Sequence, residues 1–150
     1  MVLDELVRAL NELYRLSGSA RVHADTVRST GVVISQTGLR ALSLVADSPR
    51  LTGTDLAAAL DVSQPTASRV LQQLETDGLV ARHASDTDGR VSHYVTTTKG
   101  KRALAKVHRY HVQRLAFALD GADTEALAAS VTELVHRFTA AAQPSKRRTA

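Results

Sequence analysis

The chain has 150 residues, of which 43% are hydrophobic, so it is long enough for one domain with a buried core and is not a mainly disordered protein. It contains no cysteine, which excludes disulfides, thiolate zinc sites and iron–sulfur clusters. The formal net charge is +4 and the isoelectric point is near 9.8, which is typical of proteins that bind nucleic acid, although residues 51–98 alone carry a net charge of −3.

The N-terminal segment is predicted to be helical. Apolar residues recur with i, i+3, i+4, i+7 spacing from Leu3, which predicts one amphipathic helix that runs toward Val27, with Gly18 as a weak point. Gly31 follows this helix and is expected to end it. Ser35 is the expected N-cap of the next helix.

Two short helices separated by a three-residue turn are predicted in the middle of the chain. The first, residues 54–60, begins with a capping box formed by Thr52 and Asp55. The second begins at its N-cap Ser63 and runs to about Asp77. Small apolar residues have the spacing of a wedge between the two helices: Leu56, Ala57, Leu60, Val62, Ala67 and Val70. This arrangement is typical of a DNA-reading helix-turn-helix.

The second of these helices has the polar face of a recognition helix. The candidate DNA contacts are Ser63, Gln64, Thr66, Ser68, Arg69 and Gln72. Arg69 can bond one guanine in two places, and Gln64 and Gln72 can do the same for adenine. Ser63 and Thr66 lie at the helix N-terminus, where a phosphate is favoured. The alternative is an ordinary capped surface helix.

A β-hairpin is predicted directly after this helix. Residues 79–83 and 91–96 have the composition of two strands, and Asp88-Gly89 between them is a turn signal. A helix-turn-helix followed by a hairpin is a winged helix. Arg90 lies near the hairpin tip, from which it would enter the minor groove, where arginine is favoured. The alternative is a plain surface turn.

Two further helices complete the chain, with a break at Asp120-Gly121. Residues 104–119 are apolar nearly all round the helix, which in a small chain indicates burial against a partner subunit. Two-fold symmetry then predicts a pseudo-palindromic operator, with the recognition helices ~34 Å apart. His108 and His111 have the i, i+3 spacing to share one metal, and His23 of the N-terminal helix is a candidate third ligand. A full zinc site needs about four ligands, so we predict no metal site.

Residues 35–104 resemble the MarR family of bacterial transcription regulators. The resemblance rests on four motifs: Leu51-Thr52-x-x-Asp55-Leu56-Ala57; Ser63-Gln64-Pro65-Thr66-Ala67-Ser68-Arg69-Val70-Leu71-x-x-Leu74-Glu75-x-x-Gly78-Leu79-Val80-x-Arg82; Asp86-x-Asp88-x-Arg90; and Thr97-x-x-Gly100. The sequence departs from the family pattern at Thr96, where leucine is common, and at Ser92, where an apolar residue is usual.

The resemblance implies an obligate homodimer built by the N- and C-terminal helices. It also implies that Asp88 braces the wing and that Arg90 inserts in the minor groove. A small, often aromatic or anionic, effector is implied between the dimer helices and the winged helix. Its candidate polar partners are Tyr14, Arg15, Arg40, Tyr110 and Arg114.

We therefore expect a mainly α (α+β) fold with three parts: a winged helix-turn-helix in residues 35–100, an all-helical dimerisation region formed by residues 1–34 and 101–142, and a basic flexible tail, residues 143–150. The expected function is a sequence-specific regulator that binds double-stranded DNA as a homodimer, represses, and responds to a small ligand. The alternatives are a zinc-responsive regulator of the same fold and a winged-helix module that binds protein.

Enzymatic and membrane functions are not expected. The sequence has no nucleophile elbow, phosphate-binding glycine loop or His-Glu-x-x-His motif, so we predict no catalytic residues and no cofactor. No apolar run approaches the roughly 20 residues of a membrane span, and residues 1–5 do not begin a secretory signal. We therefore expect a cytoplasmic protein without membrane contact.

Overall fold

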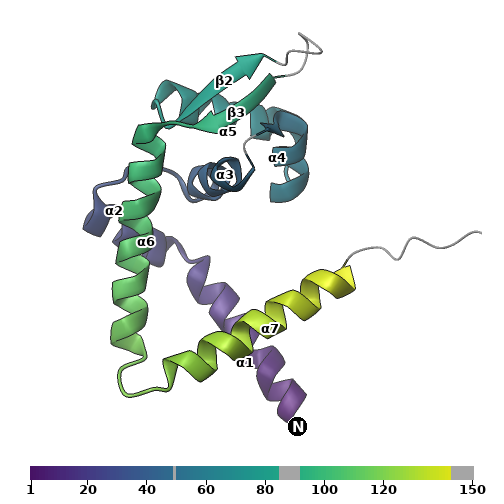
Figure 1. Cartoon of the computed structure of the whole chain (residues 1–150), viewed down its shortest axis with the longest axis vertical. Helices are drawn as coiled ribbons and strands as arrows, with labels where there is room; N and C mark the ends of the chain where they lie inside the picture. Colours follow the sequence, from purple (N-terminus) through teal and green to yellow (C-terminus); the bar gives the residue numbers. More distant parts are fainter. Residues whose placement is uncertain (49, 85–91, 143–150) are drawn as a thin grey trace, which may run out of the picture. The chain divides into compact units, whose positions relative to one another are not determined.

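A computed structural model describes residues 1–48, 50–84 and 92–142 of the chain. Most of these residues are helical, and three short strands form one antiparallel sheet (Figure 1). In chain order the elements are α1 (Val2–Ser17), α2 (Ala20–Thr30), α3 (Gln36–Asp47), β1 (Leu51–Thr52), α4 (Gly53–Leu60), α5 (Gln64–Thr76), β2 (Val80–Ala84), β3 (Ser92–Thr96), α6 (Thr98–Ala118) and α7 (Thr124–Ala142). The fold class expected from the sequence is confirmed.

The hydrophobic core lies between α3, α4, α5 and the sheet, and Ala103 of α6 adds to it. Helices α3, α4 and α5 pack together against the sheet, whose strand order is β1-β3-β2 (Figure 1). The fully buried side chains include Leu42 of α3, Leu56 of α4 and Leu71 of α5. Each comes from a different helix, so burial of one apolar face per helix holds the three together.

Side-chain caps begin six of the helices, α2 to α7. Ser35 and Ser63 accept hydrogen bonds from backbone N–H groups of α3 and α5, as the sequence predicts. The capping box of α4 is also confirmed, because Thr52 accepts from the Asp55 N–H and the Asp55 carboxylate accepts from the Thr52 N–H. Gly78, with φ of 68°, follows α5 in the left-handed conformation that glycine tolerates.

The N-terminal helix differs from the prediction. The expected single helix toward Val27 is two helices, because α1 ends at Ser17 and α2 begins at Ala20. The Ser19 hydroxyl accepts from the Val22 N–H and caps the new helix. The interruption at Gly18 is therefore a full break, for which Ser19 is the local signal.

The sheet also differs in detail. Strand β1 was not predicted; its two residues pair with β3, Leu51 opposite Tyr94 and Thr52 opposite His93. Strand β2 begins and ends one residue later than the predicted 79–83. Two-residue strands carry no readable alternation, so only tertiary pairing defines β1.

The packing where β3 leads into α6 explains why threonine and glycine occur in the Thr97-x-x-Gly100 motif. The Thr97 hydroxyl donates to the Gly78 carbonyl over 2.7 Å and accepts from the Gly100 N–H over 3.1 Å. A Cβ on Gly100 would lie 2.2 Å from the Leu79 carbonyl oxygen, which is too close for any other residue. The motif thus lets α6 begin directly against the end of α5.

Two compact units divide the chain, Met1–His111 and Val112–Ala150. Helix α6 begins in the first unit and ends in the second. Among the described residues, no helix combines the length and apolar character needed to cross a lipid bilayer.

Candidate nucleic-acid interface

Helix α5 has one buried face and one exposed face. Ala67, Leu71 and Leu74 are buried in the core. At about 100° per residue, Arg69 and Gln72 fall on the opposite side. Every predicted DNA contact at this helix is exposed in the single chain: Ser63, Gln64, Thr66, Ser68, Arg69 and Gln72.

The apolar wedge predicted from the sequence holds α5 against α4. Leu56 and Ala67 have no exposed surface, and Ala57 and Leu60 are nearly as deeply buried. Alanine side chains on both helices allow the close approach that this packing requires. In the intervening turn, Asp61 adopts a positive φ of 54°. The buried wedge therefore fixes the side of α5 that stays exposed.

The side-chain hydroxyls in the first turn of α5 are already within hydrogen-bond distance of each other. The Ser63 and Thr66 hydroxyl oxygens lie 2.9 Å apart, and Ser63 also accepts from the Thr66 N–H over 3.4 Å. Pro65 in the same turn has no N–H. A phosphate at this end would therefore meet the two hydroxyls and the positive end of the helix dipole.

Arg69 is the main cation of the exposed face. Within the described ranges it takes part in no ion pair, whereas other arginines do: Arg15 pairs with Glu12, Arg28 with Asp25 and Arg137 with Glu133. Its guanidinium therefore keeps its full set of donors for an external acceptor.

Two nearby acidic side chains, Asp55 and Asp77, are engaged at helix ends. Asp55 belongs to the capping box of α4, where hydrogen bonds from the Thr52 hydroxyl and then the Thr52 N–H hold its pKa below the ordinary value. Asp77 accepts a hydrogen bond of 3.0 Å from the Gln73 amide at the end of α5. Two of the six acidic residues in 51–98 are therefore engaged at helix ends, whereas Glu75 is exposed on α5.

The base of the wing is defined by β2 and β3. The Arg82 guanidinium donates to the Ser92 hydroxyl over 2.8 Å across these strands. This contact gives a physical reason for serine at a position where the family pattern is apolar. The predicted wing residues Asp88 and Arg90, like the basic tail of residues 143–150, lie outside the described residues.

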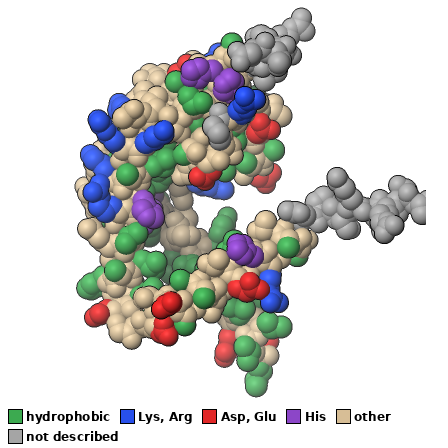
Figure 2. All heavy atoms as spheres, viewed as in Figure 1, with side chains coloured by type: hydrophobic (Ala, Val, Ile, Leu, Met, Phe, Trp, Pro, Cys, Tyr) green, Lys and Arg blue, Asp and Glu red, His purple; other side chains and the backbone are tan. Residues whose placement is uncertain are grey.

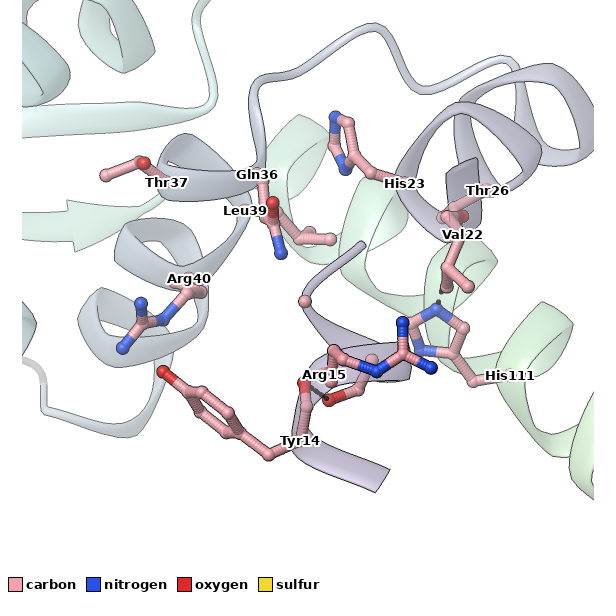
Figure 3. A pocket seen from close by; sticks show the side chains of 12 residues that line it. Tyr14, Arg15, Val22, His23, Thr26, Gln36, Thr37, Leu39, Arg40 and His111 are labelled. Atoms are coloured by element: carbon pink, nitrogen blue, oxygen red, sulfur yellow. Dashed lines mark hydrogen bonds between the residues drawn. The ribbon is translucent and has the colours of Figure 1, made fainter. Parts of the chain in front are cut away.

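A separate cavity of about 560 Å³ lies in the unit formed by residues 1–111 (Figure 3). Three of the predicted effector residues line it, Tyr14, Arg15 and Arg40, whereas Tyr110 and Arg114 do not. Tyr14 extends toward Arg40 in this view, with Arg15 and His111 on the other side. The sequence did not identify the remaining polar lining, which includes His23, Thr26 and Gln36.

Two of the histidines that were candidate metal ligands, His23 and His111, have other contacts. His23 Nε2 lies 2.9 Å from the Ile34 carbonyl oxygen, and His111 Nε2 lies 3.5 Å from the Thr26 hydroxyl. Across the described part of the chain, no three histidine, aspartate or glutamate side chains form a metal-binding group. His83 and His93 lie opposite each other on the sheet with their rings stacked.

Comparison with known proteins agrees with this geometry. A sequence profile of the MarR family matches residues 34–91. A protein of Thauera aromatica, proposed as a transcriptional regulatory protein for the hcr operon, is 36% identical over 90 residues, which cover 59% of this chain and 53% of the relative. The chain thus aligns with only about half the length of this relative.

Solved structures share the fold over nearly the whole chain. Streptococcus pneumoniae FabT in complex with DNA superimposes with a TM-score of 0.61 at 22% identity, covering 92% of this chain and 93% of FabT. A solved MarR family transcription regulator gives a TM-score of 0.58 at 26% identity, covering 91% of this chain and 95% of the other. Residues 34–91 are thus similar to the MarR family of transcription regulators, and the fold is shared with solved members of that kind.

Proposed function

We propose that this protein is a homodimeric transcription regulator of the cytoplasm that binds a specific double-stranded DNA operator and represses. The observation that carries the proposal is the exposed polar face of α5, held outward by a buried wedge and bearing Arg69, which takes part in no ion pair among the described residues. The similar fold of FabT, solved in complex with DNA, supports it. The polar face has no catalytic constellation, so we propose no enzymatic activity.

In this proposal, side chains on the exposed face of α5 read the bases. Arg69 has the fork that bonds guanine O6 and N7, and the Gln64 and Gln72 amides suit adenine. Ser68 is short enough to contact either a base edge or a phosphate. In the same proposal, Ser63 and Thr66 hold a phosphate, Arg90 enters the minor groove and Asp88 braces the wing.

Dimerisation is proposed because three helices leave apolar faces uncovered. Helix α1 has no buried residue, although Leu3 and Leu13 are apolar. Phe117 of α6 is 88% exposed and Phe138 of α7 is 65% exposed. Such faces on a small chain are typical of association with a second copy, and two-fold symmetry then calls for a pseudo-palindromic operator.

Regulation by a small anion is proposed at the cavity beside α2 and α3. Its volume of about 560 Å³ falls within the range of small-molecule sites. Arg40 takes part in no ion pair among the described residues, so its guanidinium is available to a carboxylate. The Tyr14 ring, which is largely exposed, supplies an apolar wall and one hydroxyl. An aromatic acid has this combination of groups.

Selection of genomic fragments tests the proposal. Purified protein is mixed with sheared DNA of the organism that encodes it, and the bound fragments are sequenced. We expect strong enrichment of a few fragments that share an inverted repeat. On these fragments Arg69→Ala should cost about 1–3 kcal/mol and relax one base position.

Two comparisons sharpen the selection. Arg69→Lys keeps the charge but loses the bidentate fork of arginine. Relative to Arg69→Ala, it should therefore recover more of the affinity for DNA than of the discrimination between bases. Gln73→Ala changes a side chain that bonds Asp77 and should leave binding unchanged. No enrichment at moderate salt, together with binding that does not weaken as salt rises, would favour a protein-binding module instead.

A further inference from the structure

A pair of histidines lies on the outer face of the β2–β3 hairpin. His83 and His93 are directly opposite each other in the antiparallel register. Their ring centroids are 5.6 Å apart and their planes are inclined by 16°. The opposite face of the sheet carries Val80 and Tyr94, which face the core, so the histidine face is the one turned to solvent. Figure 2 shows histidine side chains gathered at the surface over this hairpin.

The separation suits two ligands of one metal ion. Zinc binds an imidazole nitrogen at about 2.0–2.1 Å, so two rings on a tetrahedral ion have centroids roughly 5 Å apart. A small rotation of the two side chains would therefore turn one nitrogen of each ring toward a shared ion. Within the described part of the chain, neither ring takes part in a hydrogen bond that would oppose this rotation.

The neighbouring side chains leave the face accessible. The next pair along the two strands on this face is Ala81 and Val95, neither of which carries a competing charge or donor. Arg82 lies on the other face, where it donates to Ser92. No cation among these neighbours therefore repels a bound ion from the same face of the hairpin.

We propose that His83 and His93 bind one divalent transition-metal ion that prefers imidazole nitrogen, such as Zn²⁺, Ni²⁺ or Cu²⁺. The described residues supply no group of three ligands, so water completes the coordination and the ion exchanges readily. Mg²⁺ and Ca²⁺ prefer oxygen ligands and are not bound there. The ion links β2 to β3.

A metal ion at the His83–His93 pair would affect the wing, because the pair lies near the end of the hairpin. The His83–His93 pair is one position before the strands end at Ala84 and Ser92. A bridge at this position limits the relative motion of the two strands at the base of the wing. This consequence rests on the proposed function: if the wing contacts DNA, metal binding changes the affinity for the operator.

Isothermal titration of the full-length protein with ZnCl₂ and NiCl₂ tests the site. We expect one ion per chain, and His83→Gln or His93→Gln should each weaken binding by roughly tenfold or more. His108→Gln and His136→Gln are the matched controls, since both replace exposed histidines elsewhere, and should bind as the parent does. Equal loss in the controls, or no difference from MgCl₂, would overturn the proposal.

Thermal unfolding provides a second measurement. An ion held by the folded hairpin raises the midpoint of unfolding in the parent and not in His83→Gln. A rise of the same size in both proteins would overturn the site. Operator binding with and without Zn²⁺ is measured separately: unchanged affinity despite titratable binding refutes only the effect on the wing, whereas failure to bind any DNA refutes only the proposed function.

Discussion

The winged-helix region and the terminal helices differ in what covers their apolar side chains. In residues 35–100 the apolar side chains of three helices and a sheet cover one another, and Leu42 has no exposed surface. In α1 and α7 the apolar residues are as regularly spaced, yet none of them is buried. The same amphipathic pattern therefore produces a buried core in one region and an exposed apolar face in the other, for which we propose a second copy of the chain as the cover.

The difference in burial between the two regions also corresponds to two different proposed roles, DNA reading and dimerisation. A region whose core is complete holds α5 in a fixed orientation, which reading a DNA sequence requires. In the proposed dimer, the terminal helices of two chains cover one another and set the distance between two such regions. In this account, stability of the first region is independent of protein concentration, whereas order in the second depends on it.

Truncating the core tests the self-sufficient region and has the largest expected effect. Leu42→Ala removes a fully buried side chain from α3, so it should lower the free energy of unfolding by about 2–5 kcal/mol. Denaturant unfolding at several protein concentrations measures it. A loss that disappears at high protein concentration would contradict the comparison.

A polar substitution on the exposed face of α6 tests the dependent region. Phe117→Ser should weaken self-association by about 1.5–3 kcal/mol per buried phenyl group, because it removes an apolar side chain that only a partner can bury. Sedimentation equilibrium measures the change in dimer dissociation. The account is wrong about this face if Phe117→Ser dimerises as well as the parent.

A smaller effect of opposite sign is expected at Thr96. Its hydroxyl is the buried side-chain oxygen without a hydrogen-bond partner among the described residues, at the position where the family pattern has leucine. Thr96→Val keeps the shape and removes that oxygen, so it should raise the free energy of unfolding by about 1 kcal/mol. Thermal unfolding checks the sign, and a destabilised variant would indicate that the hydroxyl has a partner.

The smallest effect concerns acid pH and the capping box. Because the folded pKa of Asp55 is lowered, mainly by the Thr52 hydroxyl, its carboxylate stabilises the fold above the ordinary aspartate pKa. That contribution is lost as the pH falls through the folded pKa. The difference in stability between the parent and Asp55→Asn should therefore be largest near pH 7 and should shrink toward pH 3.

The winged helix was predictable because its signals are local. Caps at Ser35, Thr52 and Ser63 mark where helices begin, and the alternation of apolar residues marks the faces that become buried. The break at Gly18 was underestimated because its decisive signal is one serine. Strand β1 could not be predicted, since two residues acquire strand character only by pairing with β3.

The candidate site was predictable in part. Exposure of the α5 contacts follows from the position of Ala67 and Leu71 on the opposite face. Only three residues of the cavity beside α2 and α3 could be predicted, because its lining comes from α1, α2, α3 and α6, which meet only in the fold. The pairing of His83 with His93 depends on the register of β2 against β3. The sequence alone does not determine that register.

The central claim is that terminal helices join two self-sufficient winged helices into one DNA reader. Native mass spectrometry of the free protein and of its complex with a selected fragment tests this claim most directly. The account predicts a free species of twice 16.1 kDa and a complex of two chains on one duplex. A free monomer at micromolar concentration that binds DNA as a single chain would contradict it.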